Sequence, residues 1–250
     1  MLTVLAGDVL ADRVGGSPAR VLALHGWGRS GADFARVLDG TDGLAVHLPG
    51  FGPTAPPPEA WGSVEYAEHL AAALDGLGDT RPAVVVAHSF GGRVAVRLAA
   101  RRPDLVAALV LTGVPLVRAT PPPRPRLALR VAKRLHAAHV LPSVVVDRLR
   151  RSGGSADYQA AQGVLRGVLV RVVGEDYRED LARVAASGVP VDLVWGELDD
   201  AAPLAGARLA AELLPGASLT VVPGAGHLLE GALEGAVRDA VHARLAGGAA

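Results

Sequence analysis

A serine stands where a short apolar run meets a glycine-rich helical segment, and this position can make it a nucleophile. The segment reads Ala87-His88-Ser89-Phe90-Gly91-Gly92. A serine in a strand-to-helix turn is forced into a strained conformation that exposes its hydroxyl, and small residues two before and two after it let strand and helix approach. Ala87 and Gly91 supply these small residues. We therefore predict Ser89 as a nucleophile; the alternative is a glycine-rich turn with an incidental serine.

Two later segments supply the base and the acid that a serine hydroxyl needs in order to attack a carbonyl carbon. Gly224-Ala225-Gly226-His227 follows the last apolar run, and Trp195-Gly196-Glu197-Leu198-Asp199-Asp200 follows the run before it. We predict His227 as general base and Asp199 as the acid that orients it, although each alone could be a loop residue or a helix cap. The chain order serine, aspartate, histidine is a known order of catalytic triads. His88 is expected to point from its strand in another direction and is given no role.

A glycine-rich turn near the N-terminus supplies the remaining part of a hydrolytic site. His25-Gly26-Trp27-Gly28 follows an early apolar run and can aim a backbone N–H at the serine. The residue after the serine begins a helix, so its N–H also points toward developing negative charge. We predict the N–H groups of Trp27 and Phe90 as the oxyanion hole, with a plain tight turn as the alternative.

Short, β-branched apolar runs alternate with helical patterns along most of the chain and define the elements that must position these residues. The predicted strands cover 21–24, 44–46, 84–86, 109–111, 191–195 and 219–222, and the predicted helices 64–76, 90–101, 203–214 and 229–245. This alternation predicts a mainly parallel sheet with helices on both faces. Ligands of such sheets bind beyond the carboxyl ends of the strands, where the three predicted residues fall. Arg93, Arg97 and Arg101 are expected on the surface of their helix.

The region 115–184 breaks this rhythm because it contains no clear strand. It opens near Thr120-Pro121-Pro122-Pro123 and shows helical patterns near 126–139, 143–151, 156–172 and 176–186. We interpret it as a helical cap inserted between two parts of one core domain, 1–114 and 185–250. A chain of 250 residues fits this organisation.

The composition excludes several classes of function. Half of the residues are apolar, so a large core is expected, and the formal net charge of zero gives no argument for a nucleic-acid partner. Cysteine is absent, and no His, Asp and Glu cluster has metal-ligand spacing, so we expect neither metal nor cofactor. The first residues lack a basic start, and no run approaches the roughly 18 apolar residues of a membrane span. We therefore expect a cytoplasmic protein.

With these residues in place, the chain resembles the serine-nucleophile branch of the α/β-hydrolase superfamily. The resemblance covers nearly the whole length and rests on His25-Gly26-Trp27-Gly28, Leu48-Pro49-Gly50-Phe51-Gly52, the turn around Ser89, Gly196-Glu197-Leu198-Asp199 with Pro203, and Gly226-His227. It implies an α/β-hydrolase fold with a helical cap. The position of Pro203, four residues after Asp199, matches the family pattern and favours Asp199 over Glu197 and Asp200.

Within this superfamily the chain is most similar to the pimeloyl-[acyl-carrier protein] methyl ester esterase group. The similarity is carried by the first two of those segments and by Arg178-Glu179-Asp180-Leu181. Two positions depart from the family pattern, because His47 stands where aspartate is usual and Thr54 where serine is frequent. These positions support a loop, so the departures bear on the particular esterase rather than on the superfamily.

The predicted reaction is hydrolysis of a carboxylic ester or thioester of a small acyl substrate through an acyl-enzyme on Ser89. The resemblance leaves room for a cofactor-free carbon–carbon hydrolase, a lyase or a perhydrolase that uses the same three residues. A protein of another class, which binds a ligand and turns it over slowly, is a further alternative. The sequence does not indicate an oligomeric state.

The predicted cap carries a concentration of positive charge. Nine basic residues and one acid lie between 118 and 151, among them Arg130 and Arg134. Charge runs of this kind usually form a solvated helix face. The functional alternative is a basic lid that attracts an anionic or carrier-bound acyl substrate.

Overall fold

The protein is described by a computed structural model, which covers residues 1–5, 7–77, 83–118, 135, 142 and 156–247. Its strands are β1 (Leu2–Val4), β2 (Leu10–Val14), β3 (Val21–Leu24), β4 (Gly43–His47), β5 (Ala83–His88), β6 (Val106–Thr112), β7 (Val191–Gly196) and β8 (Ser218–Val222). Its α-helices are α1 (Ser63–Asp75), α2 (Phe90–Arg101), α5 (Ala156–Ala160), α6 (Gly163–Val173), α7 (Arg178–Ser187), α8 (Leu204–Leu213) and α9 (Gly231–Gly247). Two short 3-10 helices are η1 (Gly31–Phe34) and η2 (Pro103–Leu105). In this part of the chain, no helix is long and apolar enough to cross a membrane.

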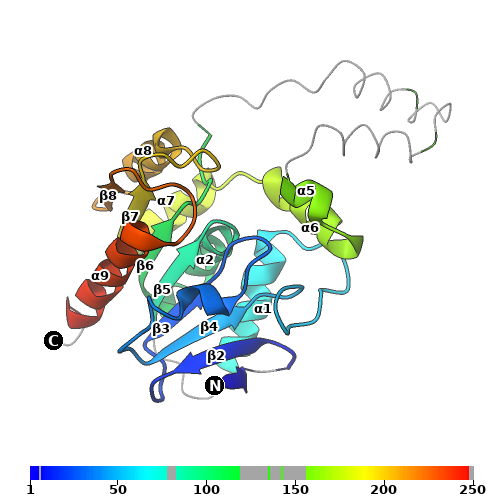
Figure 1. The fold of residues 1–250 in the computed structure, drawn as a ribbon, viewed down its shortest axis with the longest axis horizontal. Helices are drawn as coiled ribbons and strands as arrows, with labels where there is room; N and C mark the ends of the chain where they lie inside the picture. The colour runs from blue at the N-terminus through cyan, green and yellow to red at the C-terminus, as the bar shows by residue number, and fades with distance from the viewer. Residues whose placement is uncertain (6, 78–82, 119–134, 136–141, 143–155, 248–250) are drawn as a thin grey trace.

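The strands form one sheet in the order β1-β2-β4-β3-β5-β6-β7-β8 (Figure 1). The pairs from β4 to β8 are parallel, so the predicted, mainly parallel sheet is confirmed. β1 and β2 were not predicted, and they pair antiparallel at one edge. The sequence does not indicate this edge, because β2 is only partly buried and Asp12 and Arg13 interrupt its apolar pattern.

Side chains of the central strands alternate between two cores, one on each face of the sheet. Leu22 and Leu24 of β3 face one core, and Val21 and Ala23 face the other. All four are buried, as a parallel sheet covered on both faces requires. This explains why the strands read as continuous apolar runs rather than as alternating ones.

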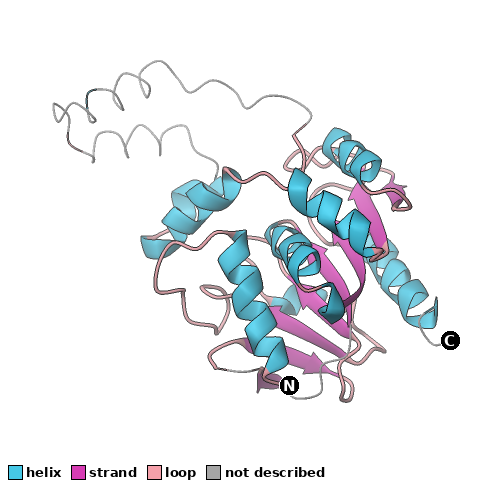
Figure 2. Cartoon of the chain, turned by 180° about the vertical axis from the view of Figure 1, so that it is seen from behind, coloured by secondary structure: helices cyan, strands magenta, loops and turns pink. Residues whose placement is uncertain are grey.

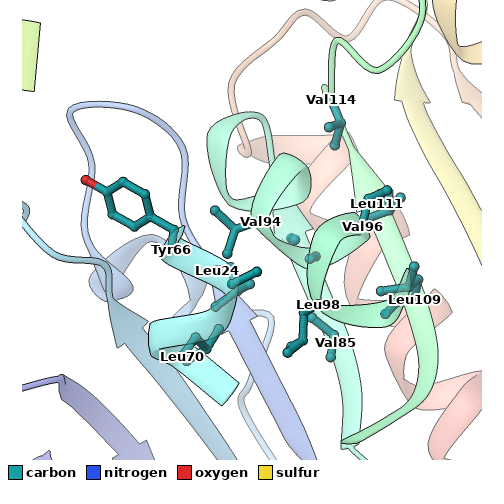
Figure 3. Close-up of a cluster of buried hydrophobic side chains, with 14 of the residues drawn as sticks. Leu24, Tyr66, Leu70, Val85, Val94, Val96, Leu98, Leu109, Leu111 and Val114 are labelled. Atoms are coloured by element: carbon teal, nitrogen blue, oxygen red, sulfur yellow. The ribbon is translucent and has the colours of Figure 1, made fainter. Parts of the chain in front are cut away.

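Helices cover both faces of the sheet, as the alternation predicts. α1, α2, α7 and α8 pack on one face, and Figure 2 views the molecule from their side. Figure 3 shows the apolar cluster between this helical layer and the sheet, where Leu98 of α2 lies beside Val85 of β5 and Leu70 of α1 lies near Leu24 of β3. η1 and α9 cover the opposite face through Phe34 and other buried apolar residues.

The last part of the predicted cap contains three helices in place of two. A single helix was predicted over 156–172, but it is divided into α5 and α6. Gln162 is extended and Gly163 has φ of 52°, a left-handed value that favours glycine and breaks the helix. The stretches predicted near 126–139 and 143–151 lie almost wholly outside the described residues, as do Arg130 and Arg134.

A buried polar network joins α7 to α1 and α2, and it corrects one prediction. Arg93 and Arg97 were expected on the surface, but they are only 8% and 9% exposed, because α6 and α7 cover this side of α2. Arg97 pairs with the Asp180 carboxylate, and Arg101 Nη1 donates to Asp180 Oδ1 at 2.7 Å. Arg97 also donates to Ser63 Oγ at 3.1 Å. The hydrogen bonds of this network replace those to water that the charged groups lose on burial.

Candidate active site

Ser89 occupies the turn between β5 and α2, and its backbone has an unusual conformation. Its φ is 49° and its ψ is −109°, and it is the one non-glycine residue with positive φ in the described part of the chain. Such values are costly for a residue with a Cβ atom and persist only where the surroundings enforce them. The Ser89 N–H donates to the Thr112 carbonyl of β6 at 3.0 Å, which holds the turn against the sheet.

Two glycines after the serine allow α2 to begin close to the sheet. A Cβ atom on Gly91 would lie 2.3 Å from the carbonyl oxygen of Leu24, and one on Gly92 would lie 2.1 Å from Val114. The Gly91 N–H donates to the carbonyl of His25 at 3.0 Å. Position 91 therefore has no room for a side chain, which is the physical reason for the glycine there.

His227 and Asp199 are brought together on the loops that follow β8 and β7. His227 Nδ1 lies 3.0 Å from Asp199 Oδ1 and 2.9 Å from Asp199 Oδ2. The carboxylate is buried, and its Oδ1 also accepts the N–H groups of Ala201 and Ala202 at 3.0 and 2.7 Å. Because Nδ1 donates to the carboxylate, Nε2 of the neutral ring is left as the proton acceptor.

The other two acids of this segment are placed differently. Glu197 Oε2 accepts the Gly224 N–H at 3.0 Å, so it holds the loop that leads to the histidine. Asp200 is exposed. Gly196 lies so near this loop that a Cβ atom would be 2.2 Å from the carbonyl oxygen of Gly226. Of the three acids, Asp199 is the one that contacts the histidine ring.

The two predicted oxyanion-hole donors are unoccupied. In the described part of the chain, neither the Trp27 N–H nor the Phe90 N–H has a hydrogen-bond acceptor. The two side chains are neighbours, with ring centroids 5.4 Å apart. Buried or half-buried backbone N–H groups are nearly always paired, so two free donors from separate loops are consistent with the predicted oxyanion hole.

His25 fixes the turn that carries Trp27. The Leu48 N–H donates to His25 Nε2 at 3.1 Å, so Nδ1 carries the proton and donates to the Gly26 carbonyl at 2.8 Å. Burial lowers the pKa of His25 to about 4 and keeps the ring neutral. The side chain therefore acts as a neutral bridge between two backbone segments.

His47 joins the end of β4 to the start of η1 by a related arrangement. The Gly31 N–H donates to His47 Nδ1 at 3.2 Å, and His47 Nε2 lies 3.1 Å from Asp12 Oδ2. The ring lies so close to Gly52 that a Cβ atom on that glycine would be 2.6 Å from His47 Nδ1. The departure at position 47 thus leaves the loop hydrogen-bonded, now through an imidazole whose second nitrogen pairs with a carboxylate.

His88, which was given no role, contacts His227. Its Nε2 donates to the His227 carbonyl at 2.9 Å, and the two ring centroids are 4.8 Å apart. The sequence analysis gave His88 no role, and its contact with the predicted base was not expected. No residue spacing in the sequence indicates this contact, because it depends on how the loop after β8 packs against the end of β5.

Ser89 and His227 are not hydrogen-bonded to each other through their side chains. Across the described ranges, Ser89 Oγ has no hydrogen-bond partner at all. Hydrogen bonds of this type are frequently long in hydrolases without substrate and tighten in the complex. Among the residues that the structure describes, no group of three His, Asp or Glu side chains could hold a metal ion.

Comparisons with known proteins identify the family. Residues 21–239 match the sequence profile of the alpha/beta hydrolase family. Lipase LipV of Mycobacterium tuberculosis is 44% identical over 110 residues, which make up 42% of this chain and 41% of that relative. The pimeloyl-[acyl-carrier protein] methyl ester esterase of Chromobacterium violaceum is 31% identical over 241 residues, or 88% of this chain and 91% of that relative. The chain thus spans about two fifths of the length of the lipase.

Solved structures agree with this assignment at the level of the fold. A hydrolase of Pseudomonas aeruginosa PA01 has a TM-score of 0.72 and covers 98% of both chains, at 23% sequence identity. From the family match, the parallel sheet and the turn at Ser89 together, we conclude that the chain belongs to the alpha/beta hydrolase family.

Proposed function

We propose that the chain is a serine hydrolase that cleaves a carboxylic ester through an acyl-enzyme on Ser89. The observation that carries the proposal is the hydrogen bond between His227 Nδ1 and Asp199, formed at the sheet edge where the strained turn exposes Ser89. A serine hydroxyl becomes an effective nucleophile when such an oriented imidazole accepts its proton. Trp27 and Phe90 supply the two free N–H groups that the reaction requires.

In the first half of the reaction His227 Nε2 accepts the hydroxyl proton while Ser89 Oγ bonds to the carbonyl carbon of the ester. The carbonyl π electrons move to oxygen, and the N–H groups of Trp27 and Phe90 stabilise the resulting anion. Asp199 stabilises the imidazolium without accepting its proton. The intermediate collapses as the bond to the alcohol oxygen breaks, and His227 gives that oxygen the proton.

The second half repeats these steps with water. His227 accepts a proton from water as its oxygen bonds to the acyl carbon, and the same N–H groups stabilise the second tetrahedral anion. The bond to Ser89 Oγ then breaks, and His227 returns the proton to the serine. The products are a carboxylic acid and an alcohol, and the protein is regenerated.

The names of the relatives favour an ester as the substrate. One is a lipase and another is an esterase of a carrier-bound methyl ester. We place a small acyl group in this site, with an anionic or carrier-bound substrate as the specific case to test. In this proposal residues 115–184 act as a helical cap, of which α6 contacts the core where Leu165 lies against Gly50 and Gly167 against Ala60.

Labelling and hydrolysis together test the proposal. An organophosphonate should label Ser89 in the native protein, and Ser89→Ala should reduce kcat for activated esters by about 10⁴–10⁶-fold, as in measured triads. Ser218→Ala is the matched control, because Ser218 is exposed on β8, and it should be labelled and active like the parent. A panel of esters and thioesters of graded acyl length then identifies the preferred bond and chain.

Three outcomes would overturn the proposal. Full activity in Ser89→Ala, or labelling at another residue, would exclude the mechanism. Tight binding of an ester with a slow turnover that Ser89→Ala does not reduce would point to a ligand-binding protein. Absence of ester and thioester hydrolysis, with cleavage of a carbon–carbon bond, would assign the same residues to another reaction.

A further inference from the structure

The last residue of β5, His88, lies between the nucleophile and the loop that carries the base. Its Nε2–H donates to the backbone carbonyl of His227 at 2.9 Å. The two rings are in contact, with centroids 4.8 Å apart and planes inclined by 47°. His227 is therefore held at two points, with its ring bound to Asp199 and its carbonyl bound to His88.

Two glycines leave the space that the His88 ring occupies. A Cβ atom on Gly26 would lie 2.7 Å from His88 Nδ1, and a Cβ atom on Gly113 would lie 3.2 Å from His88 Cδ2. The Gly113 atom would also lie 3.0 Å from His227 Cε1. The His88 ring thus packs directly against the turn that carries Trp27, the end of β6 and the base itself.

Protonation matters because the two imidazoles are so close. Burial, and next the neighbouring charge of His227, lower the pKa of His88 to about 4. At neutral pH the ring is therefore uncharged, with its proton on Nε2 and none on Nδ1. An uncharged neighbour does not oppose the charge that His227 acquires when it accepts a proton.

We propose that His88 is a positioning residue that fixes the backbone of His227 so that its Nε2 faces Ser89. The inference rests on the proposed serine-hydrolase function. Asp199 orients the imidazole, and Glu197 and Leu198 hold the start of the loop at Gly224 and Ala225. The hydrogen bond from His88 fixes the backbone at His227 itself. A displacement of about 1 Å at a reacting group can reduce a rate about 100-fold, so this constraint affects turnover rather than binding.

A matched pair of amides tests this role. The side-chain nitrogen of glutamine is as many bonds from Cα as His88 Nε2, so His88→Gln retains a donor toward the His227 carbonyl. The shorter side chain in His88→Asn places its amide near the position of Nδ1 and cannot reach that carbonyl. Both variants bury a neutral amide, so a merely structural role predicts similar losses in both.

For a short activated ester, we expect His88→Asn to lower kcat by about 10- to 100-fold with little change in KM. His88→Gln should stay within about threefold of the parent, with both melting temperatures recorded. Equal losses of kcat in the two variants, in step with their loss of stability, would overturn the proposal. A parent that hydrolyses no ester, or a fully active Ser89→Ala, would instead reject the proposed function.

Nitrogen NMR of the parent protein gives a result that needs neither activity nor a folded variant. Histidine ¹⁵N shifts should show His88 with a proton on Nε2 and none on Nδ1, and without charge at pH 6. A neutral ring with its proton on Nδ1 would have no hydrogen on Nε2 to donate to the His227 carbonyl, and it would overturn the inference. A charged ring at that pH would keep this hydrogen bond and contradict only the uncharged state of His88. If the variants fold, the ring signals of His227 should shift in His88→Asn and remain near the parent values in His88→Gln.

Discussion

Two regions of this molecule differ in whether their polar groups have hydrogen-bond partners. In the network between α2 and α7, the Asp180 carboxylate receives Arg97 and Arg101, and Ser63 Oγ bonds to Arg97 and to Glu175. At the sheet edge, Ser89 Oγ and two backbone N–H groups have no partner among the described residues. Buried polar groups are normally satisfied. The free groups at this edge are therefore the feature that distinguishes the proposed reactive region from the supporting one.

Replacing Asp199 tests the reactive region most severely after the serine itself. Asp199→Asn can still accept the N–H groups of Ala201 and Ala202, but its amide favours the wrong tautomer of His227. We expect kcat to fall about 10⁴-fold while the protein stays folded. Glu197→Gln and Asp200→Asn are the matched controls and should retain most activity, since neither contacts the imidazole. If either control is the more damaging change in steady-state assays, the acid has been assigned wrongly.

Replacing the ion pair tests the supporting region. Asp180→Leu leaves the buried Arg97 without its carboxylate and should lower the free energy of unfolding by about 3–5 kcal/mol, as measured by urea denaturation. The double variant Arg97→Met with Asp180→Leu should lose less, because no buried charge is left unpaired. Below the unfolding transition, kcat of both variants should stay within a few-fold of the parent.

Glu179→Gln on the same helix is the control, because its pair with Arg183 is exposed and should contribute at most about 1 kcal/mol. A large loss of kcat in Asp180→Leu under conditions where it is folded would break the distinction between the two regions. It would show that the α2–α7 network also positions the reactive groups.

The smallest effect concerns the basic stretch of the predicted cap. If that stretch attracts an anionic acyl substrate, kcat/KM for that substrate should fall as salt rises, since the screening length shortens from about 10 Å at 0.1 M to about 3 Å at 1 M. A neutral ester of equal length should change little. Reversing Arg130 and Arg134 to glutamate should abolish the difference. The same salt response for both substrates in the parent would identify an ordinary solvated surface.

Much of the fold could be predicted because local sequence encodes it. The helix predicted over 90–101 has the bounds of α2, and the parallel strands appeared as apolar runs because both of their faces are buried. β1 and β2 were not predicted, because an edge hairpin that is half exposed to solvent has no continuous apolar run. The break at Gly163 was missed because one left-handed residue leaves the helical periodicity around it unchanged.

The site was predictable where a backbone constraint restricts residue type. The turn at Ser89 needs small neighbours, so Gly91 was visible from the sequence. Contacts between distant loops have no such sequence signal, so the contacts of His88 and Gly113 with His227 were not predicted. Arg97 was expected on the surface, because helical periodicity does not indicate whether a second helix covers the charged face of the first.

The conformation of Ser89 also has a consequence for how this protein can be changed. A glycine at position 89 would adopt the same φ at a far lower cost in free energy. Replacing Ser89 by glycine should therefore stabilise the turn. With Ser89 as the proposed nucleophile, stability and activity make opposite demands on this position. A search for heat-resistant variants that ignores catalysis would favour inert molecules here, so any laboratory evolution of this chain has to select for turnover at every round.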